Sequence, residues 1–208
     1  MKSLLAAFLI LSVCLPLAAK TIDIPEEHLS IDIPNEWTSA SQSGTLLSAA
    51  DANNNSGITV ASFPNTQNQA ITPGFIAGME KGMVEQGPKI NATVEITARK
   101  PATLNGIPSY SVQSKMTFPN SKIVYVHTYP IAVNGKYYVI ALRTLDADKD
   151  PELQTIANSF RFTTPPTLPD PSRNSLAYKL GQVTGFILFW GILLAAISGL
   201  IAMVRRKS

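Results

Sequence analysis

Short alternating runs of apolar and polar residues fill most of the chain between residues 21 and 162, and this period of two is typical of half-buried β-strands. The run from His28 to Ile33 places Leu29, Ile31 and Ile33 on one face. Because several runs follow one another, we expect an antiparallel sheet. The further runs lie at 45–50, 57–63, 91–98 and 110–118.

A strong turn signal fixes the pairing of the central strands. Asn134-Gly135 lies between two apolar runs, and this dipeptide favours a two-residue hairpin turn with both residues at positive φ. The resulting register sets Tyr129 opposite Ile140 and His127 opposite Leu142.

A second hairpin is expected at Asn120-Ser121, with Met116 opposite Tyr125. Because side chains alternate between the two faces of a strand, this register gathers apolar and aromatic side chains on one face. Other elements of the chain must pack on that face to remove it from water. Its members are Phe118, Met116, Tyr125, Tyr129, Ile140 and Leu142.

Two helical patterns offer that cover. Thr72-Pro73 places a cap residue before a proline, and apolar residues then recur at helical spacing until Gly87. A shorter helix is predicted to start at Pro151, with Asp150 as its cap. Sheet and helices together predict an α+β domain over residues 20–162, an antiparallel sheet packed between helices.

Both ends of the chain carry membrane signals. Residues 1–19 have a charged start, a short apolar core and small residues before Lys20, the layout of a cleaved secretory signal. No charged residue lies between Lys179 and Arg205, so residues 180–204 are long enough to cross a lipid bilayer as a helix. The basic tail at 205–208 predicts a single-pass protein of the inner (plasma) membrane, with a cytoplasmic C-terminus and a periplasmic or extracellular domain.

The charge distribution agrees with this topology and argues against a nucleic-acid partner. The chain has a net charge of +3, but residues 20–173 hold 12 of the 17 Lys and Arg residues and all 14 Asp and Glu residues, a net charge of −2. The other cations flank the two apolar segments. Cleavage after Ala19 removes Cys14, the only cysteine, so the mature domain forms neither a disulfide nor a thiolate metal site.

Residues 163–173 differ in character from the domain before them. They contain four prolines and no apolar period. Such a segment favours an extended spacer of roughly 30 Å, which would hold the domain off the membrane.

The membrane segment carries small residues at regular spacing. Gly191, Ala195 and Gly199 are four residues apart and share one helix face, and Gly181 and Gly185 form a second pair nearer the outer edge. Small residues at this spacing let two helices approach closely. Glycine and alanine are also common in membrane helices without such a role, so pairing with a second copy, as a homodimer, or with another membrane protein is one of two interpretations of this spacing.

The order of several short motifs resembles the Mog1/PsbP-like domain family over nearly all of residues 21–162. The resemblance implies an antiparallel sheet packed between helices. It carries over no catalytic residues, because the family shares none. Its members, which include photosystem II extrinsic subunits, a Ran-binding nuclear import factor and bacterial envelope proteins, mostly bind other proteins. The motifs are Ile31-Asp32-Ile33-Pro34-Asn35-Glu36-Trp37, Asn105-Gly106, Gly135-Lys136-Tyr137-Tyr138 and Ser159-Phe160-Arg161-Phe162.

Catalytic chemistry has one candidate. The predicted register places His127 near Ser114, and a His–Ser pair oriented by Asp146 or Asp148 would form an activated nucleophile. However, the sequence contains no Gly-x-Ser-x-Gly and no Ser-x-x-Lys motif. We therefore favour a structural role for His127, at the rim of the core with one hydroxyl partner.

Two loops rich in side-chain oxygens imitate calcium loops. One starts at Asp51 and the other at Asp146, but their twelfth positions are Ser62 and Ala157, where a bidentate glutamate belongs. The acidic and amide side chains are better explained as turn and cap residues that bond nearby backbone groups. The sequence predicts no metal and no cofactor.

Trp37, His127 and Tyr129 are candidates for lining a ligand groove, although aromatic residues on strands more often pack in a core. The leading hypothesis is a non-enzymatic, membrane-anchored domain that acts in protein interaction or assembly at the cell envelope. The alternative is a module that binds a small molecule or a lipid, or, failing that, a hydrolase that uses His127.

Overall fold

The computed structural model describes residues 18–40, 44–170 and 181–185. In this part of the chain two antiparallel sheets and two α-helices form an α+β fold, which confirms the predicted class. The larger sheet has the order β3 (Thr38–Ala40), β4 (Leu47–Ala50), β5 (Ser56–Pro64), β9 (Lys136–Thr144), β8 (Ile123–Val133), β7 (Ile107–Thr117) and β6 (Thr93–Leu104). The smaller sheet has the order β1 (Ala19–Ile24), β2 (Leu29–Pro34) and β10 (Arg161–Phe162).

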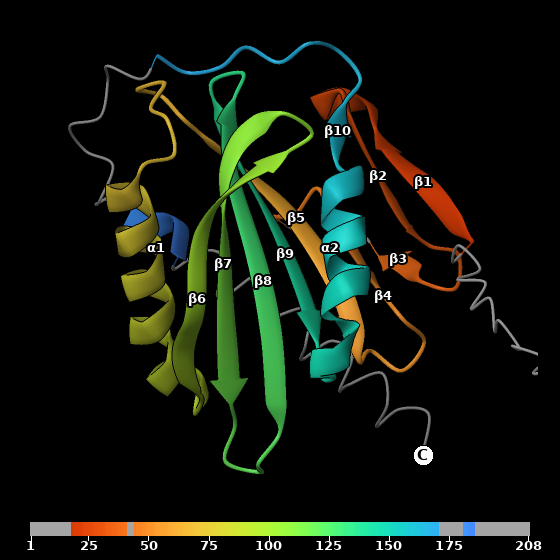
Figure 1. The fold of residues 1–208 in the computed structure, drawn as a ribbon, viewed down its shortest axis with the longest axis vertical. Coiled ribbons are helices and arrows are strands. Elements are labelled where there is room, and N and C mark those ends of the chain that lie inside the picture. The colour runs from red at the N-terminus through yellow and green to blue at the C-terminus, as the bar shows by residue number, and fades with distance from the viewer. Residues whose placement is uncertain (1–17, 41–43, 171–180, 186–208) are drawn as a thin grey trace, which may run out of the picture.

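The two helices lie on opposite faces of the larger sheet, so that two apolar cores form. Helix α1 (Pro73–Gln86) and helix α2 (Asp150–Ser159) are separated by the sheet in Figure 1. Phe75 and Met79 of α1 pack against one face, while Leu153 and Ile156 of α2 pack with the smaller sheet against the other. β1 begins at Ala19, opposite Pro34 of β2.

Helix α1 forms as its sequence predicts. The Thr72 hydroxyl accepts a hydrogen bond of 3.2 Å from the backbone N–H of Phe75, which satisfies one of the free donors at the helix start. Pro73 occupies the first position, where its missing N–H costs nothing. The predicted apolar positions of this helix, from Phe75 to Met83, are buried.

The hairpin between β8 and β9 is confirmed. Asn134 and Gly135 both have positive φ, and Tyr129 lies opposite Ile140 as expected. His127 likewise lies opposite Leu142.

The register of the hairpin between β7 and β8 was predicted wrongly by one residue. Met116 lies opposite Val124, not Tyr125, because the loop has three residues, with Ser121 in the left-handed conformation at φ 60°. A shift of one residue moves side chains to the other face of the sheet. Met116 and Phe118 therefore pack on the α1 side, whereas Tyr129 and the residues of β9 expected beside them pack on the α2 side.

The start of α2 also differs from the prediction. Asp146, not Asp150, accepts a cap bond, from the backbone N–H of Asp148 at 3.0 Å, and a short 3-10 helix over Ala147–Lys149 leads into α2. Asp150 is the first residue of α2 and no side chain caps that helix. Its carboxylate is therefore available to the sheet.

Residues 163–170, the described part of the predicted spacer, have no regular secondary structure and stay on the domain. The N–H of Thr163 donates to the carbonyl of His28 at 2.7 Å, and Thr167 exchanges two hydrogen bonds with Asn134. The segment thus passes over one end of the sheet, from β10 toward the α1 side (Figure 1). Beyond it, residues 181–185 form a helical turn against α1.

Most of the predicted membrane elements lie outside the described residues. These are the signal segment up to residue 17, residues 186–204, the tail at 205–208, and the small residues Gly191, Ala195 and Gly199. Among the helices that the structure describes, none has the length and apolar character needed to span a membrane.

Candidate functional site

The candidate site is built where the N-terminal end of α2 meets β8. His127 is 3% exposed, and its Nε2 lies 2.8 Å from an Asp150 carboxylate oxygen. This bond joins the sheet to the first residue of the helix. Asp150 takes the orienting position that the sequence assigned to Asp146 or Asp148, so that assignment was wrong.

The predicted pair of His127 and Ser114 does not form. Ser114 lies opposite Val126, one residue away from the predicted position, and therefore on the α1 side of the sheet. Its hydroxyl and the Nδ1 atom of His127 are both buried without a hydrogen-bond partner. A serine on the other face cannot receive a proton relay from His127.

Tyr129 extends the polar cluster along β8. It is 5% exposed, and its hydroxyl forms a hydrogen bond with Ser111. Burial raises the pKa of the Tyr129 hydroxyl, the Ser111 bond lowers it, and the negative charge of Asp150 raises it further. Tyr129 therefore acts as a neutral hydroxyl rather than as a base.

Trp37 does not share a groove with His127 and Tyr129. It is 2% exposed in the core on the α2 side. Its edge lines a cavity of about 180 Å³ that includes Ser56 and Thr144 from the sheet and Asp146 and Lys149 from the segment before α2. The three predicted groove residues thus surround the start of α2 without lining one space.

The two oxygen-rich loops meet at this cavity, and their side chains act as turn residues, as the sequence predicts. Asp51 accepts hydrogen bonds from the backbone N–H groups of Asn53, Asn55 and Ser56 at 2.8 to 3.0 Å. Asp146 caps the turn before α2. Among the described residues, no group of three or more His, Cys, Asp or Glu side chains is arranged to hold a metal ion.

A further surface, which sequence reasoning missed, continues from His127 across β7 and β6. Cross-strand partners point to the same face of a sheet. The register places Lys115 and Glu95 beside Tyr125, and Gln113 and Ala98 beside His127. We define the open face as the six exposed or half-exposed residues of this region, which are Glu95, Ala98, Lys100, Gln113, Lys115 and Tyr125.

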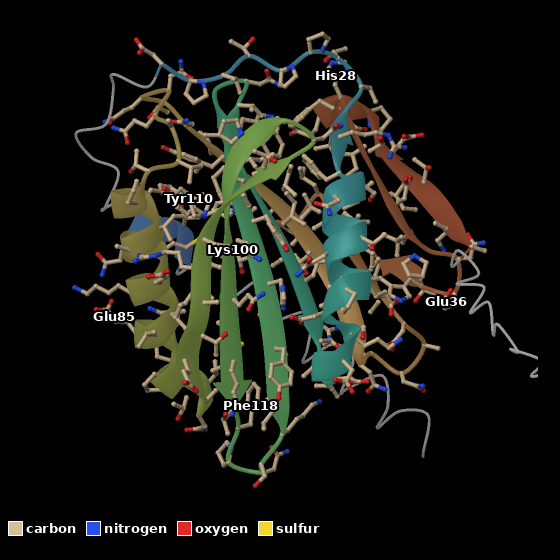
Figure 2. All side chains as sticks on the ribbon, in the orientation of Figure 1. His28, Glu36, Glu85, Lys100, Tyr110 and Phe118 are labelled. Atoms are coloured by element: carbon tan, nitrogen blue, oxygen red, sulfur yellow. The ribbon has the colours of Figure 1, made fainter. Side chains whose placement is uncertain are left out.

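The open face owes its exposure to the position of α2. That helix packs on β2 and β9 and so covers only one half of the sheet, as Figure 1 shows. Lys100 lies over the uncovered half in Figure 2. The sequence analysis missed this surface because its β7–β8 register was wrong by one residue. The predicted register placed Lys115 and Gln113 on one face of the sheet and Tyr125 and His127 on the other.

No known family model matches the sequence, and neither does any curated protein. Solved structures do match. The structure of cyanobacterial PsbP (CyanoP) from Synechocystis sp. PCC 6803 aligns over 70% of this chain and 93% of its own, with a TM-score of 0.57 and 12% sequence identity. The fold is Mog1/PsbP-like. At this identity the match establishes the fold alone.

Two further solved structures match with lower TM-scores. The Ran-binding protein Mog1p of Saccharomyces cerevisiae covers 71% of this chain and 96% of its own at 9% identity, with a TM-score of 0.49. LpqN of Mycobacterium tuberculosis, described as involved in cell envelope biogenesis, covers 76% and 88% at 15% identity, with a TM-score of 0.33.

Proposed function

We propose that this chain is a non-enzymatic, membrane-anchored domain that binds another protein at the cell envelope through the open face. The observation that carries the proposal is the open face itself. A sheet surface left uncovered by the helices presents an aromatic residue, Tyr125, among the polar side chains of Gln113, Lys115 and Lys100. Tyrosine is enriched at protein contact surfaces, where polar and charged side chains form the rim around the central contact.

The chemistry of the cluster next to the open face supports a binding role. The Nε2 atom of His127 is held by Asp150, and Tyr129 is bonded to Ser111. Both side chains thus stiffen the sheet beneath Tyr125 and Gln113. A contact surface on a rigid sheet loses little conformational entropy when a partner binds.

Placement at the membrane rests on the terminal segments. Residues 1–19 supply an export signal and residues 180–204 an apolar anchor with a basic tail. An anchored domain searches for its partner in two dimensions, so a modest affinity is sufficient when the partner shares the membrane.

A second candidate function is favoured by one groove. A space of about 530 Å³ lies at the Phe118 end of the sheet, as Figure 2 shows. It is lined by Pro88, Asn91, Ala92, Thr93, Thr117, Phe118 and Pro119. That volume falls within the range of about 300 to 1,000 Å³ for small-molecule sites. The cavity beside Trp37, at about 180 Å³, falls below it.

The proposal is tested with a photo-crosslinking amino acid at Gln113 in the full chain, expressed in its native membranes. We expect a crosslinked partner that depends on light and that is absent when the same amino acid replaces Asp23, an exposed residue of β1. The combined Lys100→Glu and Lys115→Glu change should abolish the crosslink. Lys81→Glu, an equal charge reversal on α1, should leave it.

Two results would count against this function. Equal crosslinking from Gln113 and Asp23 would mean that no specific partner contacts the open face. A small molecule or lipid that copurifies with the full chain, detected by native mass spectrometry and lost with Phe118→Asp, would favour the groove instead.

A further inference from the structure

The first turn of the C-terminal apolar segment lies in direct contact with α1 through two glycines. A Cβ atom added to Gly181 would lie 1.8 Å from the carbonyl oxygen of Phe75. One added to Gly185 would lie 2.1 Å from the carbonyl oxygen of Met79. The obstructing atoms belong to the backbone of a helix and cannot turn aside, so this contact requires glycine at both positions.

Helix α1 also contains small residues at regular spacing. Gly74, Gly78 and Gly82 recur every four residues along α1, and the last two are buried. Small residues four apart on each of two helices let their backbones come together. A polar bond fixes the contact, because the Gln182 amide donates to the Glu85 carboxylate at 3.0 Å.

The turn at 181–185 packs on one side only. Gly181, Thr184 and Gly185 are buried, while Val183 is 56% exposed. This division of buried and exposed positions is that of a helix lying on a surface. The described part of the preceding segment leads toward the same place, since residues 163–170 cross from β10 to the α1 side.

We propose that the surface of α1 is the docking site for the outer end of this chain's own membrane segment. The proposal rests on the membrane anchor of the proposed function. With residues 181–185 seated on α1, the α1 side of the domain lies next to the bilayer. The open face, on the opposite side of the sheet, is directed away from the segment and is presented to a partner. The domain is thus held at a fixed orientation against its own membrane segment, instead of being held off the membrane by the extended spacer that the prolines alone predict.

The contact is tested by crosslinking within the full chain in native membranes. Gln182→Cys and Glu85→Cys are combined with Cys14→Ala, so that no other cysteine is present. A short bismaleimide should join the two cysteines within one chain, which is detected as faster migration of the monomer on a denaturing gel. The same pair with Glu152→Cys in place of Glu85→Cys, on the opposite side of the sheet, should not react.

Substitutions at Gly181 and Gly185 test whether the crosslink depends on the close contact between these glycines and the backbone of α1. Gly181→Leu and Gly185→Leu keep the segment apolar and should each reduce the crosslink about tenfold, because a side chain cannot enter the space held by backbone atoms. Val183→Leu, in the same turn but exposed, should leave it unchanged. Undiminished crosslinking in both glycine variants would overturn the proposal.

The remaining outcomes separate this proposal from the membrane anchor. A crosslink that joins two chains would assign the surface of α1 to a second copy and overturn the proposed contact within one chain. A chain that stays in carbonate-washed membranes but forms no crosslink would overturn that contact and leave the anchor standing. A chain that carbonate extracts would overturn the anchor, and with it the placement of α1 next to the bilayer.

Discussion

The two faces of the larger sheet differ in how completely they are covered. On the α1 side, Val112, Val126 and Val139 from three neighbouring strands are fully buried in one apolar cluster with the helix. On the α2 side, the apolar cluster extends over β5, β9 and the end of β8, and it includes Leu104 and Ile107 at the hairpin that joins β6 and β7. The rest of β6 and β7 on this side carries the open face. One face of the sheet is thus buried across these strands, while the other divides its area between an apolar core and exposed or half-exposed side chains.

The two faces should differ most in how much the free energy of unfolding falls when one aromatic ring is removed from each. Phe75 is fully buried and stacks on Tyr137 with 5.0 Å between ring centroids. Phe75→Ala should lower the free energy of unfolding by about 3 to 5 kcal/mol. Tyr125→Ala, on the open face, should lower it by about 1 kcal/mol or less. Urea denaturation of the purified chain in detergent, followed by circular dichroism, measures both, and equal losses would remove the distinction.

A pair of neighbouring tyrosines sharpens the comparison at a smaller scale. Tyr138 points to the α2 side, where its hydroxyl donates to Glu27 at 2.7 Å. Tyr137 points to the α1 side, where its hydroxyl has no partner and burial raises its pKa to about 12. Tyr138→Phe should cost about 2 kcal/mol, because a hydrogen bond to a charged group is lost. Tyr137→Phe should be neutral or slightly stabilising in the same measurement, and a comparable loss there would contradict the structure.

The acid dependence of stability should also follow the α2 side. Burial acts to raise the pKa of Glu27, but the hydrogen bonds from Lys136 and Tyr138 outweigh it and hold this pKa below the ordinary value of 4.5. The ionised carboxylate therefore stabilises the fold above about pH 4.5, and this contribution is lost as the pH falls through the lowered pKa.

Glu27→Gln should accordingly flatten the fall in stability below pH 4.5, as measured by urea denaturation at a series of pH values. Glu26→Gln, the exposed neighbour, serves as the control. An unchanged slope for Glu27→Gln would show that this group does not carry the acid sensitivity.

The smallest effect on stability is expected on the open face itself. Lys100→Glu combined with Lys115→Glu should change the free energy of unfolding by about 0.5 kcal/mol or less, because both side chains are exposed or half-exposed. Thermal denaturation of this variant beside the unmodified chain provides the measurement. A large loss of stability would mean that these lysines support the fold. A loss of partner binding in this variant would then be explained by unfolding and not by a change of the contact surface.

Turn chemistry explains which parts of the fold the sequence predicts. Asn134-Gly135 supplies two residues that accept positive φ, so the register of β8 and β9 follows from it. The β7–β8 turn instead places Ser121 at positive φ, with the Asn120 side chain accepting a bond from the N–H of Lys122. No glycine marks that position, and the loop therefore has one residue more than its sequence suggests.

The candidate site was less predictable because it depends on contacts between distant segments. His127 and Tyr129 could be placed on one face from the hairpin, but the partnership with Asp150 requires the helix to start at that residue instead of being capped by it. The open face required a correct register on a third strand. The contact of residues 181–185 with the backbone of Phe75 and Met79 likewise joins segments that are distant in the sequence.

The position of β1 has a consequence for the biogenesis of the protein. The predicted cleavage point follows Ala19, which is already the first residue of β1 and pairs with Pro34, while the carbonyl of Ala18 accepts a bond from the N–H of Asn35. A peptidase must bind this peptide as an extended and unpaired chain. Cleavage at the predicted point would therefore compete with completion of the smaller sheet for the same backbone groups, and a chain that folded first would protect that point from cleavage.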